Sequence, residues 1–94
     1  MKQAVQRKTL AGNWTPFTFN HNCAHFLVKN FSNGVCYVSF EDGDDEAESI
    51  KIMSLMAETV AVCFNGDNNP EFTVSTIYVK GSGEIEVEAL DIYD

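Results

Sequence analysis

The chain has 94 residues, with six Lys and Arg against fourteen Asp and Glu, which gives a formal net charge of −8. This length supports one domain with one hydrophobic core, and an apolar content of 45% is typical of a globular protein rather than a disordered chain. A surface of this sign repels phosphate backbones, so the composition argues against a nucleic-acid partner.

Alternating apolar stretches run from Phe17 to Leu90, and short turn-like segments separate them. Many short strands at this spacing predict an all-β fold, namely a single-domain β-sandwich or jelly-roll of about eight short, mostly antiparallel strands. The turn-like segments are Ser32-Asn33-Gly34, Asp42-Gly43-Asp44, residues 66–70 and Gly81-Ser82-Gly83.

Residues 1–12 are expected to form a basic N-terminal arm, and residues 13–94 the β-sandwich domain. The arm carries Lys2, Arg7 and Lys8 and no acidic residue, so its charge is +3 against −11 for the remainder. Residues 4–10 alternate poorly, which favours an edge strand or a flexible tail. Opposite charges predict that the three basic side chains contact the acidic body of another subunit or a partner. The alternative is a tail that contacts nothing.

Residues 14–19 form the next expected strand, and Pro16 restricts it to a sheet edge because proline has no N–H for the ladder. A strand over residues 23–31 places Ala24, Phe26 and Val28 on one face, and residues 35–40 alternate in the same way. Asn33-Gly34 separates these two segments. Because Asn-Gly is the strongest short-range hairpin signal, we expect them to pair as a hairpin.

The segment 41–62 is open to two interpretations. In the first it is a helix with Asp45 as N-cap and Glu48 three residues later, and apolar residues fall at helical spacing: Ile52, Met53, Met56 and Val60. In the second it contains two strands, over residues 48–53 and 58–64, joined by a turn near Ser54. We favour the strands because the segments on both sides are strands.

The last two expected strands cover residues 72–79 and 84–90, joined by a turn at Gly81-Ser82-Gly83. The second alternates acidic and apolar residues. This pattern predicts one face in water, with Glu84, Glu86 and Glu88, and one face in the core, with Ile85, Val87 and Ala89.

One cluster resembles a metal site. His21, Cys23 and His25 lie two residues apart, and a fourth ligand could come from Cys36 or Cys63. No second ligand pair has zinc-finger spacing, so we expect no bound metal and no cofactor. Three cysteines and the lack of any signal-peptide or membrane-spanning run are typical of reduced thiols in the cytosol, without a membrane partner.

The acidic turn and the remaining motifs do not specify chemistry. Calcium would need an ordered ligand loop, which is not the pattern found here, so we expect a solvated turn at Asp42, Asp44, Asp45 and Glu46. No Gly-x-Ser-x-Gly or His-Glu-x-x-His motif occurs. The sequence therefore favours a protein that is not an enzyme.

Three segments carry a family resemblance: Ala24–Phe31, Gly34–Phe40 and Ile77–Val87. A strand of the form Phe-x-Val-x-Asn, then Tyr-Val-Ser-Phe, then Ile-Tyr-Val-Lys-Gly-x-Gly-Glu-Ile-Glu-Val resembles small bacteriophage and prophage β-sandwich proteins encoded among virion-structural genes. The resemblance implies a capsid-decoration, head-fibre or tail-associated component, oligomeric or docked on capsid or tail proteins. It implies a location in the virion and, before assembly, in the host cytoplasm. It carries no catalytic residues, and the His-x-Cys-x-His run is not part of it.

Two other functions remain open from the residues. A carbohydrate-binding or other ligand-binding jelly-roll module would use exposed aromatic side chains, and the candidates are Trp14, Tyr37, Tyr78 and Tyr93. A cupin-like metal-binding protein would use His21, Cys23 and His25.

Overall fold

The computed structural model describes residues 4–62, 73–90 and 92–93. In these residues the chain forms seven strands of one sheet and one short 3₁₀ helix. Every strand pair is antiparallel, so the predicted all-β class is confirmed. The elements are β1 (Val5–Cys23), β2 (His25–Asn30), β3 (Cys36–Ser39), η1 (Glu46–Glu48), β4 (Ile50–Ile52), β5 (Ala57–Ala61), β6 (Val74–Ala89) and β7 (Ile92–Tyr93).

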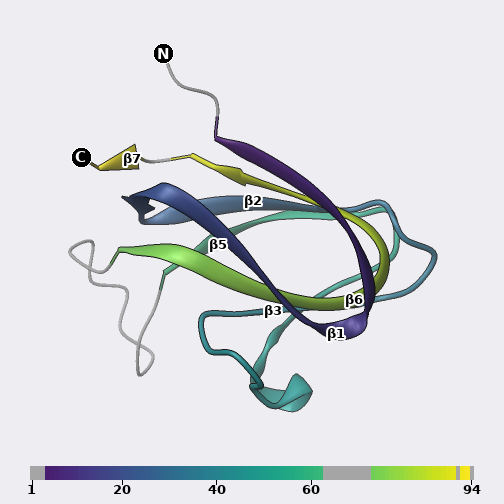
Figure 1. The fold of residues 1–94 in the computed structure, drawn as a ribbon. Helices are drawn as coiled ribbons and strands as arrows, with labels where there is room; N and C mark the ends of the chain where they lie inside the picture. Colours follow the sequence, from purple (N-terminus) through teal and green to yellow (C-terminus); the bar gives the residue numbers. More distant parts are fainter. Residues whose placement is uncertain (1–3, 63–72, 91, 94) are drawn as a thin grey trace.

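The two long strands β1 and β6 pair along most of their length and form the spine of the sheet. The first half of β6 also pairs with β3, which pairs with β4, and the second half pairs with β2, which pairs with β5. Both long strands curve, so the sheet bends over itself into a nearly closed, barrel-like shape (Figure 1). The eight short strands expected of a sandwich are therefore replaced by one continuous sheet whose central strands have 19 and 16 residues.

Glycines bend the spine without ending it. Gly12 has φ +90° beside a register shift in β1, and Gly83, opposite Leu10, has φ +126°. The predicted turn at Gly81-Ser82-Gly83 is wrong, since β6 runs through it as one strand. A residue without a side chain can take up a sharp bend while both neighbours keep their ladder bonds.

The predicted Asn33-Gly34 hairpin is also wrong. β2 pairs with β5 and β6, whereas β3 pairs with β4 and with the other half of β6. The connection crosses from one half of the sheet to the other. Neither Asn33 nor Gly34 has the positive φ that a tight hairpin turn requires.

A buried side chain holds this crossing in place of a hairpin turn. Asn30 is 1% exposed, and its Nδ2 donates to the carbonyl oxygens of Gly34 (2.9 Å), Ile52 (3.2 Å) and Met53 (3.2 Å). Its Oδ1 accepts from the backbone N–H (2.9 Å) and the hydroxyl (2.6 Å) of Ser32. Gly83 packs against Ser32 at the same crossing.

The contested segment contains strands, as favoured. β4 and β5 occupy it, and Asp45 accepts a hydrogen bond from the Ala47 N–H as the N-cap of η1, which has only three residues. Cys63 and Phe64, the end of the second expected strand, lie outside the described residues.

The core lies inside the bend of the sheet. The predicted core face of the last strand is confirmed, since Ile85 and Val87 of β6 are fully buried. The face that Phe26 and Val28 of β2 share is buried as well. The rings of Phe19 and Phe26 lie 5.7 Å apart. In the described residues, no helix is long and apolar enough to cross a membrane.

The expected basic arm lies within the sheet from Val5 onward. Residues 5–11 pair with residues 82–88 of β6, and Leu10 is buried in the core. The polar residues that make this segment alternate poorly are divided between its two faces. Arg7 and Thr9 lie opposite Glu86 and Glu84 of β6, whereas Gln6 and Lys8 lie opposite Val87 and Ile85. Lys2 lies outside the described residues.

Candidate functional site

Three of the four predicted platform aromatics lie on one outer face. Tyr37 of β3 and Trp14 of β1 both lie directly opposite Lys80 of β6, and Tyr78 lies opposite Pro16. Since directly opposed residues share a face, these side chains are neighbours, and all three aromatics are half-buried. We call Trp14, Tyr37 and Tyr78 the aromatic face. Tyr93 of β7 pairs through its backbone with Asn22 of β1, and its side chain is not described.

The acidic turn is exposed at Asp42, Asp45 and Glu46, as predicted, and it is also anchored on the aromatic face. The indole Nε1 of Trp14 donates to the Asp44 carbonyl (3.1 Å), and the Ser39 hydroxyl donates to the Asp44 carboxylate (2.5 Å). Lys80 Nζ lies 2.9 Å from Glu46 Oε2. The hydrogen bonds from Ser39 and from the Asp45 N–H lower the pKa of Asp44.

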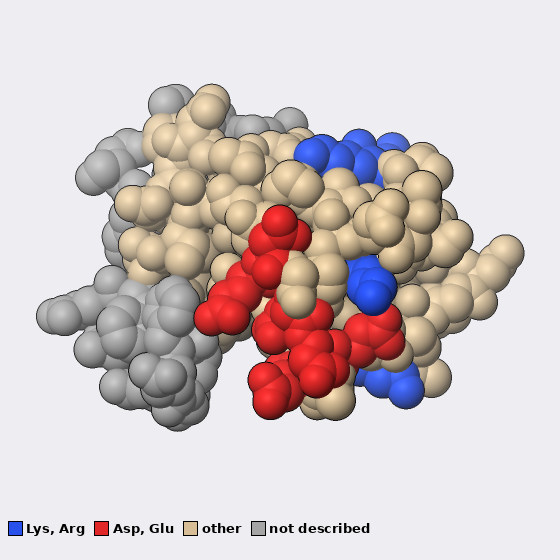
Figure 2. Space-filling model, turned by 60° about the horizontal axis from the view of Figure 1, so that its bottom comes forward, with Lys and Arg blue, Asp and Glu red and all other residues tan. Residues whose placement is uncertain are grey.

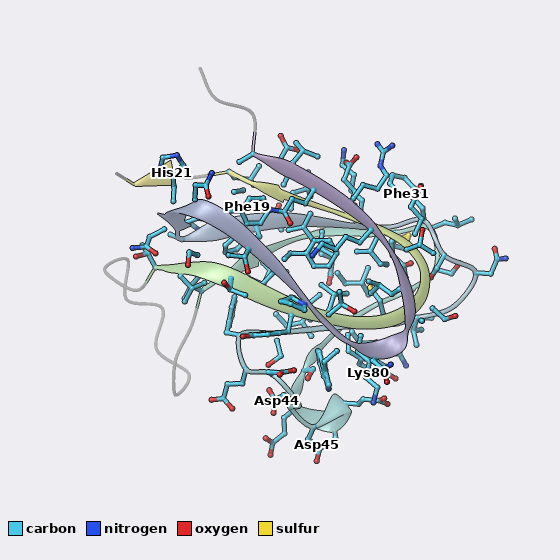
Figure 3. All side chains as sticks on the ribbon, in the orientation of Figure 1. Phe19, His21, Phe31, Asp44, Asp45 and Lys80 are labelled. Carbon is cyan, nitrogen blue, oxygen red and sulfur yellow. The ribbon has the colours of Figure 1, made fainter. Side chains whose placement is uncertain are left out.

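The same turn is the main acidic surface in view. Figure 2 shows acidic side chains gathered on one face with basic side chains beside them, and Figure 3 shows Asp44, Asp45 and Lys80 at the end of the molecule that carries η1. Trp14 therefore supports the turn, and a ligand would meet the half-buried aromatic face at its exposed edges.

The structure separates the metal-like residues. Cys23 is fully buried, whereas His25 alternates with the buried Phe26 and so lies on the outer face of β2. The chain passes from β1 to β2 at Ala24, and this change breaks the two-residue period on which the prediction depends. In residues 4–62, 73–90 and 92–93, no three His, Cys, Asp or Glu side chains lie where they could hold a metal ion.

Of the two proposed additional ligands, Cys36 is buried in the core, and Cys63 lies outside the described residues. Burial, with a smaller contribution from the charge of Glu58, raises the pKa of the Cys36 thiol to about 11.

The two described basic residues of the expected arm contact the chain's own sheet. Arg7 Nη2 lies 2.6 Å from Glu86 Oε1, and Lys29 Nζ lies 3.1 Å from Glu86 Oε2, across three adjacent strands. Lys8 Nζ donates to the Pro16 carbonyl (2.5 Å) and lies 5.0 Å from the centre of the Phe17 ring. Both basic side chains are thus used within the domain.

Glu86 is buried, whereas the sequence predicted it on the face in water. Its side chain is 9% exposed because Arg7 and Lys29 cover it from both sides. Their hydrogen bonds, that of Arg7 first, lower the pKa of Glu86. Glu84 is exposed and Glu88 half-buried, so the acidic row is only partly in water.

An exposed apolar surface lies where the favoured interpretation placed a turn near Ser54. In the loop between β4 and β5, Met53 is 55% exposed, Leu55 72% and Met56 58%, and the neighbouring Phe31 is 45% exposed. We call Met53–Met56 with Phe31 the apolar loop. Sequence reasoning considered its methionines only for their helical spacing, in the interpretation that was not favoured, and missed the loop as an exposed surface. An uncharged stretch between Lys51 and Glu58 was the available signal.

The backbone of the apolar loop is fixed. The N–H of Asn30 donates to the Met56 carbonyl (2.9 Å), and the hydroxyl of Ser54 donates to the Ser32 carbonyl (2.7 Å). Leu55 has φ +62°, a conformation that a bulky residue adopts at an energetic cost. The loop is thus held with its most exposed apolar side chain at the tip.

Comparison with known proteins adds no relative: no family model matches the chain, and no curated protein or solved structure matches it either.

Proposed function

We propose that the protein is a non-enzymatic structural component of a bacteriophage or prophage virion, acting as a capsid-decoration, head-fibre or tail-associated domain. In this proposal it is made in the host cytoplasm and docks through the apolar loop on an apolar surface of a neighbouring virion protein. For the fold, we propose that the bent sheet acts as a sandwich whose two layers share the long strands β1 and β6.

The apolar loop is the observation that carries the proposal. Exposed apolar side chains that lie together favour contact with another protein, and burying a Leu or Met contributes about 1.5–3 kcal/mol. Because hydrogen bonds to Asn30 and Ser32 already hold the loop, little conformational entropy is lost on docking. The strained Leu55 is consistent with a tip kept for contact rather than for stability.

The resemblance segments also support the proposal because they meet in space. Asn30 belongs to the first segment, Gly34 begins the second, and Gly81 and Gly83 belong to the third. Asn30 bonds to Gly34, Gly83 packs on Ser32, and Gly81 packs on Cys36. The shared residues are therefore those that build one crossing, which is the part of the fold that presents the apolar loop.

The test is particle composition. Particles are induced from the bacterium that carries the gene, purified on a density gradient, and analysed by quantitative mass spectrometry. We expect the protein to co-sediment with the particles at a constant ratio to the major capsid protein. Its recovery solely in the soluble fraction would contradict the proposal.

A pair of variants tests the role of the loop. Leu55→Asp should reduce the amount of protein in the particles at least about tenfold, since a charge replaces a buried contact. Ala11→Asp introduces the same residue at an exposed position of β1 opposite Ser82, and it should leave incorporation unchanged. Equal incorporation of both variants would exclude the loop as the docking surface.

A ligand-binding module is the second candidate, favoured by the shared position of Trp14, Tyr37 and Tyr78. Sugar rings stack on such side chains through their apolar faces. Titration with a panel of oligosaccharides, followed through Trp14 fluorescence, tests it. Saturable quenching that Tyr78→Ala abolishes would favour this candidate, and no response across the panel would exclude it for those sugars.

A further inference from the structure

The strand β5 leaves one of its edges unpaired among the described residues. It pairs with β2 over five residues in unbroken register, and no second strand lies beside it in the described part of the sheet. An unpaired edge presents a row of N–H and C=O groups to another strand.

The pairing with β2 shows which groups face outward. The Met56 carbonyl accepts from Asn30, and the Val62 N–H donates to Ala24, so the even-numbered residues of this stretch direct their backbone groups toward β2. Backbone groups alternate in direction along a strand. The N–H and C=O groups of Ala57, Thr59 and Ala61 therefore point away from the sheet.

Within residues 57–61, the edge of β5 lacks most of the usual protection. Native edges are blocked by charged side chains, especially lysine, by proline or by a bulge, and these five residues contain one charge, Glu58, but no lysine, proline or bulge. The three residues whose backbone groups face outward have small, exposed side chains. A second strand could therefore approach without a steric obstacle from them.

The same molecule protects another stretch of backbone. In β1, Pro16 has no N–H, Lys8 Nζ donates to the Pro16 carbonyl (2.5 Å), and Gln6 Nε2 donates to the Thr18 carbonyl. Side chains thus occupy two carbonyl groups of β1, whereas no described side chain bonds to the outward groups of β5. This contrast distinguishes β5 as a pairing edge.

The residues of β5 are complementary to a second copy of themselves. An antiparallel pair centred on Thr59 places Thr59 opposite its own copy and Ala57 opposite Ala61, and all the outward N–H and C=O groups of the three residues then find partners. Threonines opposite each other form a favourable cross-strand pair.

The one charge on β5 selects this register. A pair centred on Glu58 would place two carboxylates directly opposite each other, which is destabilising. A pair centred on Val60 would place Ala57 beyond the end of the partner's β5. In the register centred on Thr59, Glu58 faces Val60.

From these observations we infer that two copies of this chain form a two-fold symmetric dimer by antiparallel pairing of β5 with β5, with Thr59 at the axis. The inference does not rest on the proposed virion role, because the dimer is a property of the isolated chain.

The test uses opposite charges at the axis. Wild-type protein at about 0.2 mM should show twice the 10.5 kDa chain mass by light scattering. Thr59→Lys and Thr59→Glu each place like charges opposite each other, so each variant alone should be a monomer. Mixed in equal amounts, the two should recover the dimer. Thr9→Lys, an exposed threonine on β1, is the matched control and should remain dimeric.

Cross-linking provides a second, independent measurement. In a Cys63→Ser background, Thr59→Cys should form an intermolecular disulfide on mild oxidation, because a residue at a two-fold axis faces its own copy. Thr9→Cys should not. A monomeric wild type, dimeric single-charge variants, or equal cross-linking at both positions would overturn the inference. Circular dichroism of each variant confirms that it is folded.

Discussion

Gly83 lies so close to Ser32 that a Cβ added to Gly83 would sit 2.6 Å from the Ser32 Cβ. Gly83 also has φ +126°, which L-amino acids with a side chain rarely adopt. One residue thus permits both the bend of β6 and the close passage of the segment that connects β2 to β3.

Gly83→Ala should therefore destabilise the fold. We expect a loss of about 2–4 kcal/mol in the free energy of unfolding, from backbone strain together with the clash at Ser32. Gly34→Ala is the matched control, because a Cβ there meets nothing within 4 Å and φ is not positive. Urea denaturation measures both, and equal stability of the two variants would contradict the account of the bend.

Asn30→Asp should be among the most damaging substitutions of similar size. It replaces a donor amide by a carboxylate oxygen that faces the carbonyls of Gly34, Ile52 and Met53 in a buried position. An unpaired buried charge costs about 3 kcal/mol or more. Asn33→Asp, on an exposed residue of the same connection, should change stability by less than about 0.5 kcal/mol. Thermal unfolding of both variants would show whether Asn30 has this role.

Glu86→Gln should reveal a pH-dependent contribution to stability. Hydrogen bonds from Arg7 and then Lys29 lower the pKa of Glu86 in the folded state, below its ordinary value of 4.5. The contribution is therefore fully present above pH 4.5 and is lost as the pH falls through the folded-state pKa. Chemical denaturation of wild type and variant should show a difference at pH 7 that shrinks below pH 4.5. A difference that stays constant to pH 2.5 would exclude the ion pairs as its cause.

The thiols of Cys23 and Cys36 should be unreactive in the folded protein. Both are fully buried, and burial, aided by the charge of Glu58, raises the pKa of Cys36 to about 11, so almost no thiolate exists at pH 8. In a Cys63→Ser background, Ellman's reagent should label neither thiol before denaturation and both after it. Rapid labelling of the native protein would show that the core opens easily at this position.

Local patterns in the sequence predicted the strands and the side chains that share a face. Phe26 and Val28 in β2, and Ile85 and Val87 in β6, are buried because a two-residue period places alternate side chains on one face wherever the strand pairs. Strands were also correctly favoured over a helix for β4 and β5, because the segments on both sides are strands. The sequence indicated Trp14, Tyr37 and Tyr78 as platform candidates, and the register makes them neighbours. Nothing local indicated that Trp14 would bond to the acidic turn.

Partner choice is what the sequence by itself did not determine. Asn33-Gly34 is compatible with a hairpin and Gly81-Ser82-Gly83 with a turn. Such compatibility is a local property of the backbone, whereas strand pairing depends on contacts between segments far apart in the chain. The tertiary structure decided these cases through the burial of Asn30, which bonds the crossing and the apolar loop at once, and through the contact of Gly83 with Ser32. It also placed Arg7 and Lys8 in the sheet, where Arg7 lies opposite its ion-pair partner Glu86 on β6 and Lys8 donates to the Pro16 carbonyl of its own strand.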